Sequence, residues 1–163
     1  MEFRPCIDIH DGKVKQIVGG SLDDNKGAAE NFVSTQDARF YAEFYRSKGI
    51  TGGHVILLNK SGTEEYELTK KQALEALGYY KNGLQVGGGI TTENAKEFID
   101  AGASHVIVTS YVFRDGMIDY SRLEELVSMI GADKLVLDLS CRKKDGKYYV
   151  VTDRWQKLTD EVI

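Results

Sequence analysis

The chain has 163 residues, of which 42% are hydrophobic and 28% are charged, and its formal net charge is −4. This length and composition predict one soluble globular domain, residues 1–163, with a hydrophobic core. The negative net charge argues against nucleic acid as a partner, and no apolar run approaches the ~18 residues of a membrane span. The N-terminus lacks the pattern of a secretory signal, so we expect a cytoplasmic protein.

Two cysteines, Cys6 and Cys141, lie far apart in the sequence and lack the spacing of metal ligands. We therefore expect reduced thiols and no metal site, as is usual for a cytosolic protein. A disulfide between these two residues remains the alternative.

Short apolar strands alternate with helical patterns along the chain. The strands are predicted at residues 4–9, 13–18, 54–58, 84–86, 105–109 and 135–139. The helices are predicted at residues 36–48, 67–77, 93–101 and 120–130, and each is followed at once by a glycine that can end it. Residues 21–27 are charged and contain glycine, which indicates a loop.

This alternation indicates parallel strands joined by crossover helices. An open doubly wound sheet and a (βα)8 barrel both fit, but no G-x-G-x-x-G follows the first strand, which weakens a dinucleotide-binding fold. Polar residues gather at strand C-terminal ends, where (βα)8 barrels place their active sites. A full barrel has about 250 residues. The predicted fold class is therefore α/β, a TIM (βα)8 barrel that is incomplete and holds about the first five βα units.

The run Gly87-Gly88-Gly89 follows the predicted strand 84–86, and an amphipathic helix is expected to begin near Thr92. Glycine lets the backbone come close to a bound group, and a helix N-terminus offers free N–H groups and the positive end of the helix dipole. This combination predicts a site for phosphate or another small anion. The alternative is a tight strand-to-helix turn without a ligand.

Residues 5–16, PCIDIHDGKVKQ, resemble the opening of the (βα)8 barrels of histidine biosynthesis. The closer similarity is to the phosphoribosylformimino-5-aminoimidazole carboxamide ribotide isomerase family, in its plant and yeast-like branch. The resemblance extends over essentially the whole chain through residues 54–58, 84–90, 104–110 and 135–155, and its most specific block is 138–146. It ends where that family continues through three more βα units.

The resemblance implies an Amadori rearrangement of an aminoaldose to an aminoketose, with no redox cofactor and no metal. Such chemistry needs a general acid and a general base, and carboxyl groups can be tuned to both roles. By resemblance, Asp8 is the general base and Asp138 the general acid. The alternatives are an Asp8 that pairs with Lys13 or Lys15, and an Asp138 that is hydrogen-bonded to backbone.

The resemblance also implies a small-molecule substrate with a phosphate at each end, and neither nucleic acid nor membrane as a partner. One phosphate site would use Gly88, Gly89, Thr109 and Ser110, with helix capping as the alternative for the two hydroxyl residues. Substrate contacts are further expected from Gly20, Ser140 and Arg142. The second phosphate site of the family belongs to its seventh and eighth strands, so the fragment alone is expected to be weak or inactive.

Two other functions are compatible with the residues. The cyclase subunit of imidazole glycerol phosphate synthase is a sister barrel with a similar first strand and paired aspartates. A non-catalytic half barrel that binds phosphate and self-associates through its open sheet edge is the second alternative, because exposed strand edges favour association.

Overall fold

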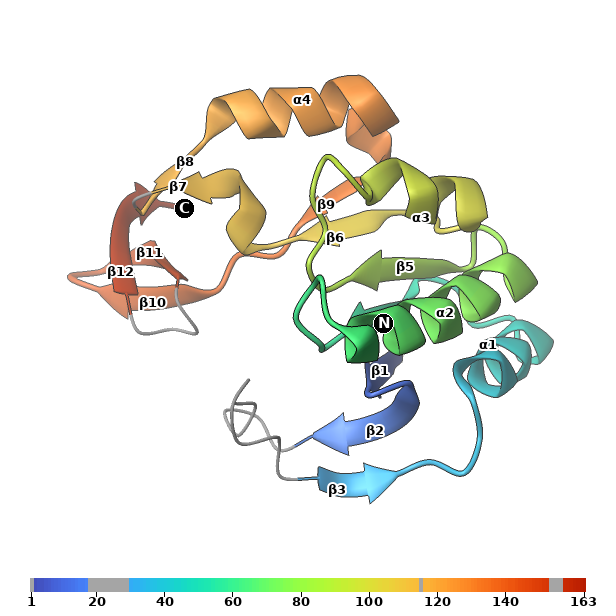
Figure 1. Ribbon diagram of the computed structural model, residues 1–163. Helices are drawn as coiled ribbons and strands as arrows, with labels where there is room; N and C mark the ends of the chain where they lie inside the picture. The colour runs from blue at the N-terminus through green and yellow to red at the C-terminus, as the bar shows by residue number, and fades with distance from the viewer. Residues whose placement is uncertain (1, 18–29, 115, 153–156) are drawn as a thin grey trace.

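A seven-stranded sheet is the centre of the fold in this computed structural model, which describes residues 2–17, 30–114, 116–152 and 157–163 (Figure 1). Its strand order is β3-β2-β1-β4-β5-β6-β9. The bounds are β1 Cys6–His10, β2 Lys13–Ile17, β3 Glu30–Val33, β4 Gly53–Leu57, β5 Leu84–Gly87, β6 Val106–Val108 and β9 Leu135–Leu137. Except for β3, each of these strands was predicted from the sequence to within about two residues.

The five strands β1, β4, β5, β6 and β9 are parallel and follow one another in chain order. Right-handed crossovers that always step in the same direction place their helices on the same face of the sheet. The helices are α1 Ala38–Ser47, α2 Glu64–Tyr79, α3 Ala95–Ala101 and α4 Tyr120–Ile130, and each contacts the next (Figure 1). A doubly wound sheet would reverse its strand order, so the arrangement is consistent with a TIM-type sheet instead.

The core lies between this sheet and its helices. In β1, Ile7 and Ile9 are buried, whereas the residues that alternate with them are half-buried or exposed. Fully buried Leu77, Phe98 and Leu126 meet the sheet from α2, α3 and α4. Burying one such side chain contributes about 1.5–3 kcal/mol, so the helix-facing side of each strand fixes its register and leaves the other face for polar groups.

Two helices differ from the prediction. α2 begins at Glu64 rather than at Glu67, after the N-cap Thr63. It does not end at Gly78 but continues to Tyr79, whose ring packs against the core. α3 begins at Ala95 rather than near Thr92, because the preceding residues form a turn in which Asn94 Oδ1 accepts a hydrogen bond from the Thr91 amide (2.9 Å). The glycine run is thus separated from α3 by a turn, which weakens the contribution of the helix dipole to an anion site.

Small antiparallel elements outside the main sheet were not predicted. β7 (Phe113–Arg114) pairs with β8 (Met117–Ile118), and a three-stranded sheet contains β10 (Cys141–Lys144), β11 (Lys147–Thr152) and β12 (Lys157–Val162). The Ile118 amide donates to Glu161 Oε1 (3.2 Å) and joins the two groups. In Figure 1 these strands lie beyond the ends of β6 and β9, on the side where those strands finish. No helix in the described ranges is long and apolar enough to cross a membrane.

Candidate active site

Asp8 lies in the middle of β1, on the face of the sheet opposite to buried Ile7 and Ile9. It is half-buried, and its Oδ1 accepts a hydrogen bond from the Cys6 thiol (2.8 Å). Part of Cys6 is exposed to solvent, yet burial raises the pKa of its thiol, and the hydrogen bond to Asp8 and the charge of that carboxylate raise it further. Cys6 and Cys141 are both free thiols, as expected. Cys6 therefore serves Asp8 as a neutral donor.

Asp138 directly follows β9 and continues its ladder, because its amide donates to Val108 O (3.0 Å). The register places one residue of each parallel strand in a single row across the sheet: Asp8, Ile56, Gly87, Ile107 and Val136. Side chains alternate along a strand, so Asp138, two residues after Val136, shares the face of Asp8. The two predicted aspartates thus lie on one face of the sheet. Asp138 is two residues further toward the C-terminal ends of the strands than the row that contains Asp8.

The glycine segment lies between these aspartates, at the end of β5. Gly88 and Gly89 have positive φ angles, 96° and 67°. An added Cβ at Gly88 would lie 2.0 Å from Leu57 O, so the neighbouring strand end leaves no room for a side chain there. No described residue accepts a hydrogen bond from the Gly88 or Gly89 N–H. Both amides are therefore available to an anion.

Thr109 and Ser110 follow β6, the next strand of the sheet, and both are exposed. Thr109 precedes the short 3-10 helix η1 (Ser110–Val112) but makes no side-chain cap to it. Because parallel strands end at the same edge of a sheet, these two hydroxyls lie at the same end as Gly88 and Gly89. Helix capping, the alternative use of Thr109, is absent.

The remaining predicted contacts are more scattered. Ser140 is half-buried, and its carbonyl accepts from the Val151 amide (2.8 Å), which ties it to β11. Arg142 lies in β10 and is exposed, so it belongs to the small antiparallel sheet and not to a parallel strand end. Gly20 lies outside the described residues.

A polar network at the β1–β2 turn escaped the sequence prediction. His10 Nδ1 lies 2.9 Å from Asp11 Oδ2, and Lys15 Nζ lies 3.2 Å from the same oxygen. The Asn59 side chain pairs with Asp11 twice, as acceptor from its amide (2.9 Å) and as donor to Oδ1 (2.8 Å). Thr69 Oγ1 then donates to Asn59 Oδ1 (2.7 Å). The Asp-Gly pair at 11–12 signals a hairpin turn, but nothing in the sequence shows that Asn59 meets it.

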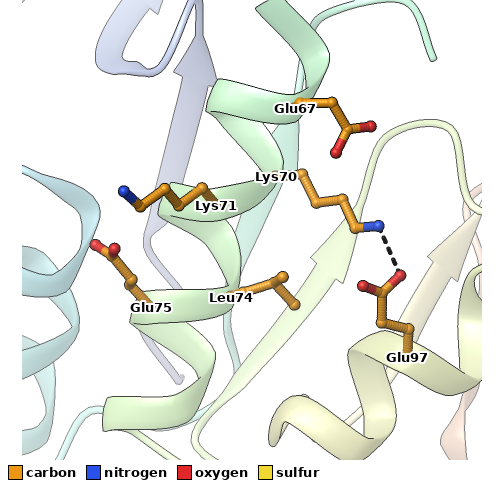
Figure 2. A pocket seen from close by; sticks show the side chains of 6 residues that line it. All are labelled: Glu67, Lys70, Lys71, Leu74, Glu75 and Glu97. Carbon is orange, nitrogen blue, oxygen red and sulfur yellow. Dashed lines mark ion pairs between the residues drawn. The ribbon is translucent and has the colours of Figure 1, made fainter. Parts of the chain in front are cut away.

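Two hollows accompany these features. One, of about 280 Å³, is bounded by Asp8 together with residues of β1, β2, β3 and α1, among them Lys15, Phe32 and Tyr41. The other, of about 410 Å³, lies between α2 and α3 on the helical layer, where Lys70 Nζ pairs with Glu97 Oε2 at 2.7 Å (Figure 2). The second hollow contains none of the predicted site residues.

The parallel strands carry carboxylates, hydroxyls and free amides at their C-terminal ends, and their helices lie on one face of the sheet. This is the arrangement of the α/β class that includes the (βα)8 barrels, which place their sites at that end of the sheet. A family model described as Histidine biosynthesis protein matches residues 2–162. The chain belongs to this family.

Similar proteins carry one name, 1-(5-phosphoribosyl)-5-((5-phosphoribosylamino)methylideneamino) imidazole-4-carboxamide isomerase. The chain is 54% identical to a chloroplastic one from Medicago truncatula, over 98% of this chain and 51% of the relative. It is 46% identical to that of Yarrowia lipolytica, over 98% of this chain and 60% of the relative, and 45% identical to that of Neurospora crassa, over 97% and 60%. The chain thus spans about half to three fifths of these relatives.

Proposed function

We propose that this chain carries part of the site of an aldose–ketose isomerase of histidine biosynthesis, which converts an aminoaldose to an aminoketose. The observation that carries the proposal is the placement of Asp8 and Asp138 on one face of the sheet, at its first and last parallel strands, with the glycine segment between them. The names of the relatives support the same activity.

In the proposed reaction Asp138 protonates the ring oxygen of the sugar and opens the ring. Asp8 takes the proton from the second carbon and delivers it to the first. Both steps need a positioned carboxyl group in the correct protonation state, and such groups contribute about 10²–10⁴-fold to a rate. The Cys6 thiol, which donates to Asp8, leaves the second oxygen of this carboxylate to act as the base.

The amides of Gly88 and Gly89 and the hydroxyls of Thr109 and Ser110 hold one phosphate of the substrate in this proposal. Ser140 and Arg142 contact the substrate from the segment that follows β9. The relatives are named for a compound with two phosphoribosyl groups. The five parallel strands represent the first five of a (βα)8 barrel, so this chain provides one of two phosphate sites and turns over slowly by itself, because binding energy for positioning is lost.

The test is conversion of the relatives' substrate by an excess of the purified chain, followed in single-turnover mode. We expect slow conversion that falls by about 10²-fold or more in Asp8→Asn and in Asp138→Asn. Conversion that survives either substitution refutes the assigned roles, and conversion at a rate ordinary for an enzyme refutes the argument that this chain provides only one of two phosphate sites. The substrate of the cyclase subunit of imidazole glycerol phosphate synthase is assayed in parallel, and we expect the chain not to convert it.

A self-associating chain is a second candidate, and exposed apolar groups on both edge strands of the sheet favour it. Leu137, on the edge strand β9, is 37% exposed, and Phe32 and Val33 of the edge strand β3 are 54% and 38% exposed. Free edges of this kind promote association. Light scattering is expected to give a dimer or a larger species, and a monomer that melts cooperatively contradicts self-association.

A further inference from the structure

His10 is the last residue of β1. It follows Asp8 by two residues and therefore lies on the same face of the sheet. Its side chain is only 13% exposed, and its Nδ1 lies 2.9 Å from Asp11 Oδ2. Lys15, which can only donate, lies 3.2 Å from the same oxygen, so Oδ2 acts as an acceptor toward both groups. Lys15 Nζ also lies 3.5 Å from His10 Nδ1, but its contact with Asp11 Oδ2 and that of Nδ1 with the same oxygen are both shorter. These shorter contacts favour a neutral ring with its hydrogen on Nδ1, which leaves the lone pair on Nε2.

Asp11 is well suited to hold this tautomer. Burial raises its pKa, but the hydrogen bonds from Asn59 and Lys15, together with the charge of Lys15 and that of His10 when its ring is protonated, outweigh burial and leave the pKa below its usual value. The carboxylate is also locked in place, since Asn59 bonds both its amide and its Oδ1. No described residue is hydrogen-bonded to His10 Nε2, so this nitrogen is available to a ligand.

The position of His10 relates it to both aspartates. One alternation along a strand is about 6.6 Å, so a group held against Asp8 is within reach of the His10 ring. The ladder that pairs Ile9 with Leu57 continues through the Leu58 amide, which donates to Ile9 O (3.0 Å), and Asp138 continues β9 in the same way. His10 and Asp138 are therefore each one alternation beyond the level of Asp8, on the same face of the sheet.

We propose that His10, oriented by Asp11, is a third acid–base group of this site and accepts the hydroxyl proton of the sugar's second carbon. The inference rests on the proposed isomerase function. When the enaminol becomes a ketone, a bond forms between the first carbon and the proton carried by Asp8, and the second carbon becomes a carbonyl as its O–H bond breaks. His10 Nε2 takes that proton and returns it through water to Asp138, which gave one to the ring oxygen.

This assignment leaves the atoms in balance, because the substrate gains one proton at the ring oxygen and loses one at the hydroxyl. The second carbon is oxidised and the first is reduced within one molecule, so no external oxidant or reductant is needed. Asp11 acts only through His10 and is a positioning residue. Asp11 and Lys15 contact the imidazole, and Asp8 lies on the same strand face two residues before His10.

Imidazole nitrogen NMR of the full chain tests the orientation without any assay of activity. We expect His10 in the Nδ1–H form, and in the form with hydrogen on Nε2 after Asp11→Asn. His105, whose ring lies 3.1 Å from Ser104 Oγ, is the internal reference and should not respond. An Nε2–H form of His10 in the unmodified chain overturns the proposal.

Ribose 5-phosphate is the probe for contact with a ligand. A shift of the His10 Nε2 signal together with the Gly88 and Gly89 amides supports the proposal. A shift of these amides without His10 overturns it and leaves the proposed function standing. If neither responds, the proposed phosphate site fails, and the role of His10 fails with it.

The single-turnover assay completes the test. His10→Gln is expected to lower the rate constant by about 10²-fold at unchanged substrate affinity, whereas His105→Gln should match the unmodified chain. Circular dichroism checks that both variants fold. Equal rates for His10→Gln and the unmodified chain refute the third acid–base group while the two-aspartate assignment stays intact.

Discussion

Gly88 and Gly89 are adjacent and both have positive φ, but the structure predicts very different costs for adding a methyl group to each. A side chain at such a φ costs about 1–2 kcal/mol, and both positions incur this cost. The Cβ of an alanine at Gly88 would in addition lie 2.0 Å from Leu57 O, whereas that at Gly89 would have no atom within 4 Å. The clash involves backbone, so no side-chain rotation relieves it, and overpacking of this kind adds about 1–3 kcal/mol.

Gly88→Ala is therefore expected to be less stable than Gly89→Ala by about 1–3 kcal/mol. For a chain of this size 1 kcal/mol moves the melting temperature by about 2–4 °C, so the two midpoints should differ by roughly 2–12 °C. Thermal and urea unfolding followed by circular dichroism measure this difference in phosphate-free buffer. Equal midpoints, or a less stable Gly89→Ala, would refute the packing argument.

Three further substitutions address a helix cap, a carboxylate and a thiol. Asp37→Ala removes the acceptor of the Phe40 amide in the first turn of α1 and should cost about 1 kcal/mol in urea unfolding. The lowered pKa of Asp11 stabilises the fold above the unfolded-state pKa of about 3.9 and is lost as pH falls through the folded value, so Asp11→Asn should be less stable at pH 7 but not at pH 2. Iodoacetamide should label Cys6 more slowly than Cys141 at pH 8.5, and Asp8→Asn should accelerate only Cys6, as read by mass spectrometry.

Each of these substitutions has its own control. Asp37→Ser keeps an N-cap oxygen and should retain most of the stability that the alanine variant loses. A stability gap between Asp11→Asn and the unmodified chain that persists unchanged into acid contradicts the linkage argument. For the thiols, Cys141 reports general changes in accessibility, so parallel acceleration of both cysteines would count against a direct effect of Asp8.

Much of the sheet could be predicted from the sequence because its register depends on local alternation of apolar residues. The small antiparallel elements are indicated by a different signal, the Asp-Gly pair. Asp11-Gly12 and Asp145-Gly146 both have positive φ at each residue, and each forms the two-residue turn between paired strands. An Asp-Gly pair is a strong hairpin signal. The Asp-Gly pair at 145–146 is therefore the sequence signal for the hairpin of β10 and β11.

The surroundings of His10 could not be predicted in this way. Asp11 and Asn59 are 48 positions apart, and their mutual hydrogen bonds arise only when β1 and β4 pair. Sequence alone shows an Asp-Gly turn and, far from it, an asparagine after a strand. The fold turns this asparagine into the group that fixes the Asp11 carboxylate, and through it the imidazole ring.

Packing in the structure accounts for part of the Gly87–Gly89 run, while an anion site at this run stays a prediction. In the sequence, the run predicts a ligand because glycine lets the backbone come close to a bound group. In the structure, a Cβ at Gly87 would lie 3.1 Å from Ile56 and from Ile107, and one at Gly88 would meet the end of β4, so packing explains two of the three. Only Gly89 faces open space. Support for an anion site therefore comes from the free amides of Gly88 and Gly89 beside two exposed hydroxyls, and not from the number of glycines.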